Sequence, residues 1–296
     1  MPSGSLLLQG LALGILMGGL YALLASGLSL YFGVMRVVMV AHPAFLFLAA
    51  YITYSLHTKT SLDPLLTLVV TVPLFFAAGV AIQRLLIARL AAETMAMMSV
   101  LLTFAMALVI EGTLGVVYTG SFRSINPDYA TKSFDLFGIQ LPYDRLIGFG
   151  IAALTLGGLA VLLKMTRFGQ SLRATIQHPQ AARLVGIKTD RVTGYGFGVG
   201  LATAAVGGAV LAIITPFFPA AHWGWIGKLM AIIVVGGLGS VQGAAIAAML
   251  LGVVESLLLV SDLPATWAAL MFYVFLFVTL LVRPQGFFGG RLAQRF

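Results

Sequence analysis

The chain has 296 residues, of which 60% are hydrophobic and 9% are charged, and its mean hydropathy is +1.05. Such values exclude a soluble domain and predict an integral membrane protein. The formal charge of +8 would suggest a nucleic-acid partner in a soluble protein, but here the charges stand between apolar runs. They are therefore read as signals of membrane topology, with lipid around the chain and no nucleic-acid partner.

Runs of roughly 20 apolar residues are needed to cross about 30 Å of hydrocarbon, and nine candidate spans follow one another along the chain. The seventh is too short for a full crossing, so a half-helix or re-entrant segment is predicted near residues 226–240, and the count is eight or nine. The fold class is an all-α polytopic membrane bundle with a single domain over residues 1–296. The candidate spans are Leu6–Phe32, Val37–Leu56, Leu65–Ile82, Met95–Tyr118, Leu146–Leu163, Gly194–Ile214, Ile226–Val235, Val241–Val260 and Ala265–Val282.

The lysines and arginines between these spans divide unequally between the two sides of the membrane. Cytoplasmic loops hold the excess of such residues, and nine crossings would place twelve of the seventeen on one side. That side is assigned to the cytoplasm, so the amino terminus is outside and the carboxyl terminus inside. The twelve are Arg36, Arg84, Arg89, Lys164, Arg167, Arg173, Arg183, Lys188, Arg191, Arg283, Arg291 and Arg295; the outer side keeps Lys59, Arg123, Lys132, Arg145 and Lys228, with Asp63, Asp128, Asp135, Asp144 and Asp262.

Two spans carry small residues at every fourth position. Such stripes let helix backbones approach closely, so helix packing is the main interpretation, with the lining of a narrow solute path as the alternative. The stripes are Gly10, Gly14, Gly18, Ala22 and Ser26 in the first span, and Gly196, Gly200, Ala204 and Gly208 in the sixth.

Few polar residues lie inside the spans. Glu111 is costly at membrane depth, so it is either a pathway or gating residue or the buried partner of a neighbouring helix. Glu255 is interpreted as an interfacial carboxylate, and His42 as a packing histidine before a proline that breaks or kinks its helix. No catalytic triad or metal-ligand cluster appears in the sequence, so no catalytic or metal site is expected. The candidate pathway residues are His42, Phe45, Glu111, Gly236, Gly237 and Gly239.

The segment RATIQHPQAARLVGIKTDRV, Arg173 to Val192, is basic and polar in an otherwise apolar chain. Pro179 suits the first turn of a helix and Gly186 the position just past its end, which predicts a two-turn helix between the fifth and sixth spans. Ala181 and Ala182 leave a smooth patch for close approach to a partner protein. Leu184 and Val185 offer apolar side chains, and Arg173, Arg183 and Arg191 offer charge to an acidic cleft; a helix lying on lipid headgroups is the alternative. The candidate docking residues are Arg173, Gln180, Ala181, Ala182, Arg183, Leu184, Val185 and Gly186.

Gln180-Ala-Ala-Arg-Leu-Val-Gly186 resembles the EAA motif of permease subunits in bacterial ABC importers, in which Glu-Ala-Ala is followed by three residues and a glycine. Three other stretches resemble one branch of these permeases: GLYALLASGLSLYFGVMRVV with AHPAFLFLAAY after it, GGLGSVQGAAIAAMLLGVVES, and VRPQGFFG. Over residues 8 to 290 the chain is similar to the branched-chain amino acid permease family, closer to its H-type subunit than to its M-type subunit. It departs at Gln180 and His178, at VAHPAF, which lacks the usual glutamate, and at Glu111.

The resemblance implies one subunit of an ATP-driven importer in the bacterial inner membrane, for branched-chain or other small apolar amino acids. The implied partners are a second related permease, two ATPases that bind ATP and Mg, and an extracytoplasmic solute-binding protein. Residues 164–193 are then the coupling loop, whose short coupling helix docks on an ATPase. The chain itself is not expected to be an enzyme or to hold a cofactor, because it lacks the phosphate loop GxxxxGK[ST]: Gly227-Lys228 is followed by Leu229.

Other functions fit parts of the sequence. Within the same machinery, urea or short amides are the rival solutes. A secondary carrier or channel acting alone would need an ion-coupling site, for which Glu111 is the candidate, and a membrane scaffold that transports nothing would leave the coupling segment unexplained.

Overall fold

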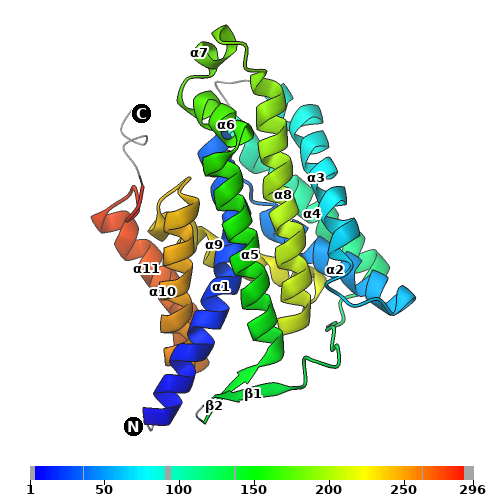
Figure 1. The fold of residues 1–296 in the computed structure, drawn as a ribbon, viewed down its shortest axis with the longest axis vertical. Helices are drawn as coiled ribbons and strands as arrows, with labels where there is room; N and C mark the ends of the chain where they lie inside the picture. The colour runs from blue at the N-terminus through cyan, green and yellow to red at the C-terminus, as the bar shows by residue number, and fades with distance from the viewer. Residues whose placement is uncertain (1–3, 36, 91–94, 137, 262, 290–296) are drawn as a thin grey trace.

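The computed structural model describes residues 4–35, 37–90, 95–136, 138–261 and 263–289, and these form a helical bundle (Figure 1). Two short 3₁₀ turns, Ile87–Arg89 and Pro219–Ala221, and a hairpin of β1 (Ser133–Leu136) and β2 (Ile139–Pro142) complete it. The α-helices are α1 (Gly4–Met35), α2 (His42–Thr60), α3 (Leu68–Leu85), α4 (Met95–Tyr118), α5 (Tyr143–Met165), α6 (Arg167–Gln177), α7 (Pro179–Leu184), α8 (Thr189–Ile214), α9 (His222–Gly236), α10 (Val241–Val260) and α11 (Ala265–Val282).

Within the described residues, seven helices are long and apolar enough to cross a membrane: α1, α3, α4, α5, α8, α10 and α11. The chain is therefore an all-α polytopic membrane protein. Two of the nine expected spans do not meet this measure. The helix α2 begins at His42 instead of Val37, because Pro43 stands in its first turn, and its second half is polar. The helix α9 has 15 residues and is about 22 Å long, less than the hydrocarbon thickness.

Helices α1 and α8 form the centre of the bundle, and their small residues bring other backbones into contact. A side chain at Gly14 would lie 2.7 Å from the Cα of Val253, and one at Gly18 would lie 2.7 Å from the Cα of Met249, both on α10. On α8, a side chain at Gly208 would meet the backbone of Leu46 on α2. The packing interpretation of the two small-residue stripes is therefore confirmed.

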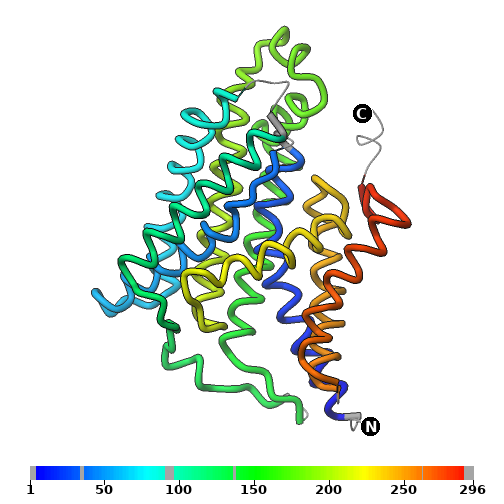
Figure 2. The backbone as a smooth tube through the Cα atoms, turned by 180° about the vertical axis from the view of Figure 1, so that it is seen from behind, coloured from blue at the N-terminus to red at the C-terminus, as the bar shows by residue number. Residues whose placement is uncertain are grey.

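The short helix α9 crosses the bundle obliquely and packs against α1, α2, α10 and α11 (Figure 2). It ends in a glycine turn in which Gly237 has φ = 98° and Gly239 has φ = 81°. The segment after α11 folds back onto this turn, where the amide of Phe287 donates to the carbonyl of Val235 at 2.9 Å. A half-helix followed by irregular backbone covered by protein is what the short seventh run predicts.

The bundle has two distinct ends (Figure 1). The amino terminus and the β1–β2 hairpin lie at one end, and α6, α7 and the carboxyl-terminal end of α11 lie at the other. The basic loop of residues 164–193 is thus on the opposite side from the hairpin, as the charge count predicts. Of the counted charges, Arg36, Asp262, Arg291 and Arg295 lie outside the described residues.

Candidate functional site

The helix α7 starts and stops where the sequence predicts. His178 precedes it and Pro179 occupies its first turn. At the other end, the amide of Gly186 donates to the carbonyl of Arg183 and the amide of Ile187 to that of Ala182, both at 3.0 Å. Gly186 has φ = 85°, a left-handed conformation that a residue with a side chain adopts at a cost of roughly 1 kcal/mol. The predicted two-turn helix with its glycine stop is confirmed.

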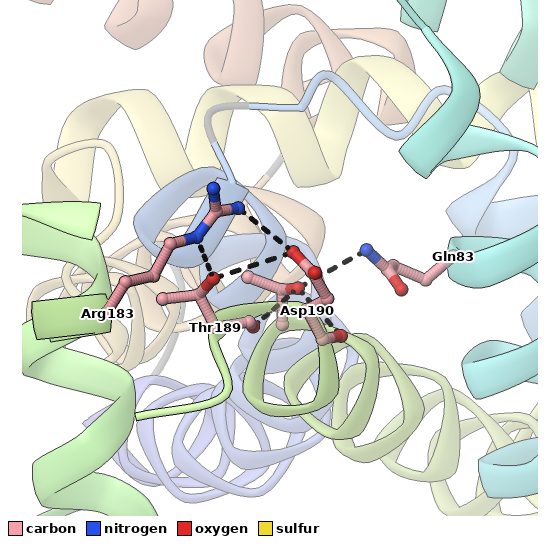
Figure 3. Close-up of polar contacts among 5 residues, drawn as sticks. Gln83, Arg183, Thr189 and Asp190 are labelled. Carbon is pink, nitrogen blue, oxygen red and sulfur yellow. Dashed lines mark hydrogen bonds and ion pairs between the residues drawn. The ribbon is translucent and has the colours of Figure 1, made fainter. Parts of the chain in front are cut away.

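A polar cluster fixes the chain that leaves α7 (Figure 3). The Arg183 side chain donates from Nε to the hydroxyl of Thr189 at 2.8 Å and from Nη2 to the carboxylate of Asp190 at 3.2 Å. These residues border an open groove of about 460 Å³. Gln83 of α3 donates to Thr193 one turn further along α8, at 3.3 Å. Arg183 is expected to offer its charge to a partner; its side chain is 63% exposed and also contacts the start of α8.

The two sides of α7 differ sharply in exposure. Leu184 is 89% exposed and Val185 is 77% exposed. Gln180 and Ala181 are also exposed. Ala182, in contrast, is only 3% exposed. The expectation that Ala181 and Ala182 form one open patch is therefore wrong for Ala182, because that residue faces the rest of its own chain.

A second helix in the same loop was not expected from the sequence. Thr166 caps the start of the helix α6, because its hydroxyl accepts from the amide of Gly169 at 3.1 Å. Its Leu172 is buried with Leu30 of α1, while Arg173 folds back and donates to the carbonyl of Leu163. Apolar residues at 168, 172 and 176 could have revealed this helix, since a spacing of four places them on one face. It seats α7 on the bundle.

The candidate pathway residues of α2 lie in the core. His42 is fully buried, and its Nε2 lies 2.9 Å from the carbonyl of Leu24. Within the described part of the chain, its Nδ1 has no hydrogen-bond partner. Phe45 is 6% exposed and its ring meets that of Phe75 edge-on. Both side chains are packed between helices, which agrees with the packing interpretation of His42.

The three candidate pathway glycines lie against backbone. A side chain at Gly236 would meet Gly243 at 2.5 Å, and one at Gly237 would meet Gly289 at 2.3 Å. A side chain at Gly239 would lie 2.8 Å from the Cα of Gly33 on α1. Close backbone approach requires glycine at all three positions, and Gly237 and Gly239 also have positive φ.

Glu111 on α4 reaches the first turn of α9. Its Oε2 accepts from the indole Nε1 of Trp223 at 2.8 Å and lies 3.9 Å from Nε2 of His222. Its side chain is 26% exposed, whereas that of His222 is 1% exposed. Of the two interpretations of Glu111, the structure supplies the contacts for the second, a pair with a neighbouring helix.

A second charged contact joins α9 to α10, and the sequence interpretation missed this pair. Lys228 of α9 lies 2.7 Å from Oε1 of Glu255 on α10, and the hydroxyl of Tyr21 on α1 donates to the other carboxylate oxygen. Glu255 is therefore a largely buried carboxylate that is paired with Lys228. Lys228 belongs to α9 and not to an outer loop. A lysine inside a candidate half-helix was the signal, because a charge at membrane depth needs a partner.

Comparison with known proteins shows which family the chain belongs to. Residues 10–281 match the family model described as branched-chain amino acid transport system / permease component. The chain belongs to this family. No solved structure gives a significant match.

Individual members of the permease family match the chain over nearly its whole length. It is 27% identical to the high-affinity branched-chain amino acid transport system permease protein LivH of Salmonella typhimurium, over 95% of each chain. It is 26% identical to LivH of Escherichia coli K12, again over 95% of each chain. A shorter match, 36% identical over 37% of this chain and 32% of the relative, is to the autoinducer 2 import system permease protein LsrC of Yersinia enterocolitica.

Proposed function

We propose that this permease-family chain forms half of the pathway of an ATP-driven importer for branched-chain or other small apolar amino acids. A second related permease completes the pore. Two ATPases bind ATP and Mg at the cytoplasmic end, and an extracytoplasmic solute-binding protein delivers the solute at the other end. Membership of the family supports the importer role, and the names of the full-length relatives favour branched-chain amino acids over urea or short amides.

One observation carries the coupling role: α7 lies at the far tip of the bundle (Figure 1), and the apolar side chains at its end are exposed. Leu184 and Val185 are among the most exposed large apolar side chains of the chain. The backbone bonds at the carboxyl-terminal end of α7 and the Arg183 contacts support the helix that presents these side chains. A rigid apolar knob on a short helix fits a groove in a partner protein. We assign α7 as the helix that docks on an ATPase.

The helix α9 is proposed to line the pathway in place of the glycines that follow it. It is too short to span; Glu111 contacts its first turn and Lys228 lies in its second turn, and both side chains are about a quarter exposed. Lipid does not solvate such groups, so their uncovered sides face water or protein. His42, Phe45, Gly236, Gly237 and Gly239 support the walls of this pathway through packing.

The end that carries α7 is assigned to the cytoplasm, with the amino terminus outside. We expect Gln177→Cys and Asp128→Cys to react from opposite sides of the membrane, since both residues are exposed and lie on opposite ends. An impermeant maleimide on intact cells should label Asp128→Cys, and Gln177→Cys should need permeabilised cells. Labelling of both in intact cells contradicts the assigned topology.

Uptake by proteoliposomes tests the proposed function. Liposomes that hold the complete complex and receive loaded binding protein should accumulate labelled leucine when ATP is supplied on the ATPase side. A hydrolysis-deficient ATPase should remove uptake while the complex stays assembled, because the energy comes from another chain. Uptake that persists with this ATPase, or follows an ion gradient, would identify a secondary carrier instead.

A further inference from the structure

Lys228 sits in a cage of three aromatic rings contributed by α1, α9 and α11. Its ammonium nitrogen lies 5.6 Å from the ring centre of Tyr21, 5.6 Å from Trp225 and 5.1 Å from Phe272. Tyr21 meets both other rings edge-on, at centroid distances of 5.8 and 5.9 Å. Such faces attract a cation, and the attraction grows when water is excluded. The cage and Glu255 together fix one positive and one negative group side by side.

The cluster is accessible on one side. The Lys228 side chain is 24% exposed and that of Glu255 is 11% exposed. An ammonium group carries three hydrogens, of which one points to Glu255 in the described contacts. Lipid does not solvate the remainder, so the uncovered side faces water or protein, which fits the pathway proposed along α9. Glu255 lies five residues before the end of α10, about 7–8 Å along the helix, at the end opposite α7, where a delivered solute enters.

The charge balance of the cluster selects a class of solute. A paired lysine and glutamate are neutral together, and a neutral α-amino acid is itself a pair of opposite charges. Its carboxylate can share the Lys228 ammonium while its ammonium group faces Glu255, so the total charge at membrane depth does not change. A singly charged solute would add an uncompensated charge there. Urea and short amides would gain little from an ion pair.

We propose that Lys228 and Glu255 form a transient binding site for the zwitterionic head group of an α-amino acid at the outer entrance of the pathway. This inference rests on the proposed import function and deepens it. Lys228 takes the carboxylate, and Glu255 keeps the cluster neutral between transport cycles.

The double variant Lys228→Met/Glu255→Gln distinguishes a role in solute binding from a role in helix packing alone. It removes both charges, so no unpaired charge is left in the bundle. We expect normal complex yield and ATP hydrolysis stimulated by loaded binding protein within twofold of wild type, while leucine transported per ATP falls at least tenfold. Lys132→Met, which removes an exposed charge at the same end, should keep the wild-type ratio. A wild-type ratio in the double variant would show that the pair only braces the helices.

Labelling of the unmodified complex gives a test that does not depend on folding of a variant. A small, water-soluble reagent that reacts with amines should modify Lys228, and mass spectrometry measures this modification. Millimolar leucine should slow the modification several-fold, whereas acetamide should not. No modification of Lys228, or equal modification with both solutes, overturns the proposal. If the wild-type complex shows no ATP-dependent uptake at all, the proposed import function fails. Uptake with no protection of Lys228 rejects the head-group site alone.

Discussion

Leu184→Glu is expected to remove ATPase association while leaving the permease folded. Leu184 is 89% exposed, so the change costs the isolated chain little. In the complex, covering a leucine side chain typically contributes about 1.5–3 kcal/mol, and each 1.4 kcal/mol corresponds to roughly a tenfold change in the dissociation constant. Co-purification of the ATPase with the variant, followed by hydrolysis with loaded binding protein, should show at least a tenfold loss of association and no stimulation.

The matched control for Leu184→Glu is Phe134→Glu. Phe134 is an exposed apolar residue on β1, at the opposite end of the bundle. The same charge placed there should leave ATPase recovery and hydrolysis at wild-type levels. Normal ATPase recovery with Leu184→Glu would mean that α7 is an ordinary surface helix.

Ala182→Glu is expected to damage the loop itself and not only the docking surface. Ala182 is 3% exposed and its carbonyl accepts the bond that closes the end of α7. Forcing a larger side chain into such a packed contact typically costs about 1–3 kcal/mol, and the added carboxylate is deprived of water. Limited trypsin digestion of the permease without its ATPase should therefore cut faster at the arginines and lysines of residues 164–193.

Ala181→Glu provides the comparison on the same helix. Ala181 is exposed, so this variant should resist trypsin as the wild type does and lose only ATPase binding. Equal trypsin resistance of the Ala182 and Ala181 variants would contradict the seating of α7 through Ala182.

Much of the bundle could be predicted from the sequence because the membrane imposes simple rules. A long apolar run has few alternatives to a spanning helix, and this rule located α1, α3, α4, α5, α8, α10 and α11. The ends of α7 could also be predicted, because a proline in the first turn and a glycine just after the last turn act through local backbone geometry. The start of α2 was placed too early, at Val37, although Pro43 was expected to break or kink this helix.

The remaining features depend on contacts between distant segments. A helix of six residues has too little periodicity to show which face is buried, so Ala182 was placed on the wrong side. Lys228 and Glu255 meet across α9 and α10, and counting Lys228 as a loop charge concealed the pair. The pathway glycines were assigned by their position after a half-helix, whereas their neighbours, such as Gly33 and Gly243, become visible only in the folded chain.

Site-specific photo-cross-linking from α7 tests most directly the claim that this helix couples the permease to an ATPase. The chain contains no cysteine, so Val185→Cys carries a unique thiol for a benzophenone maleimide. Gln140→Cys on β2 offers the same chemistry at the other end. In the assembled complex, light should join the ATPase to the permease from position 185 and not from position 140. An assembled, hydrolysing complex in which position 185 reacts only with lipid or solvent would contradict the account.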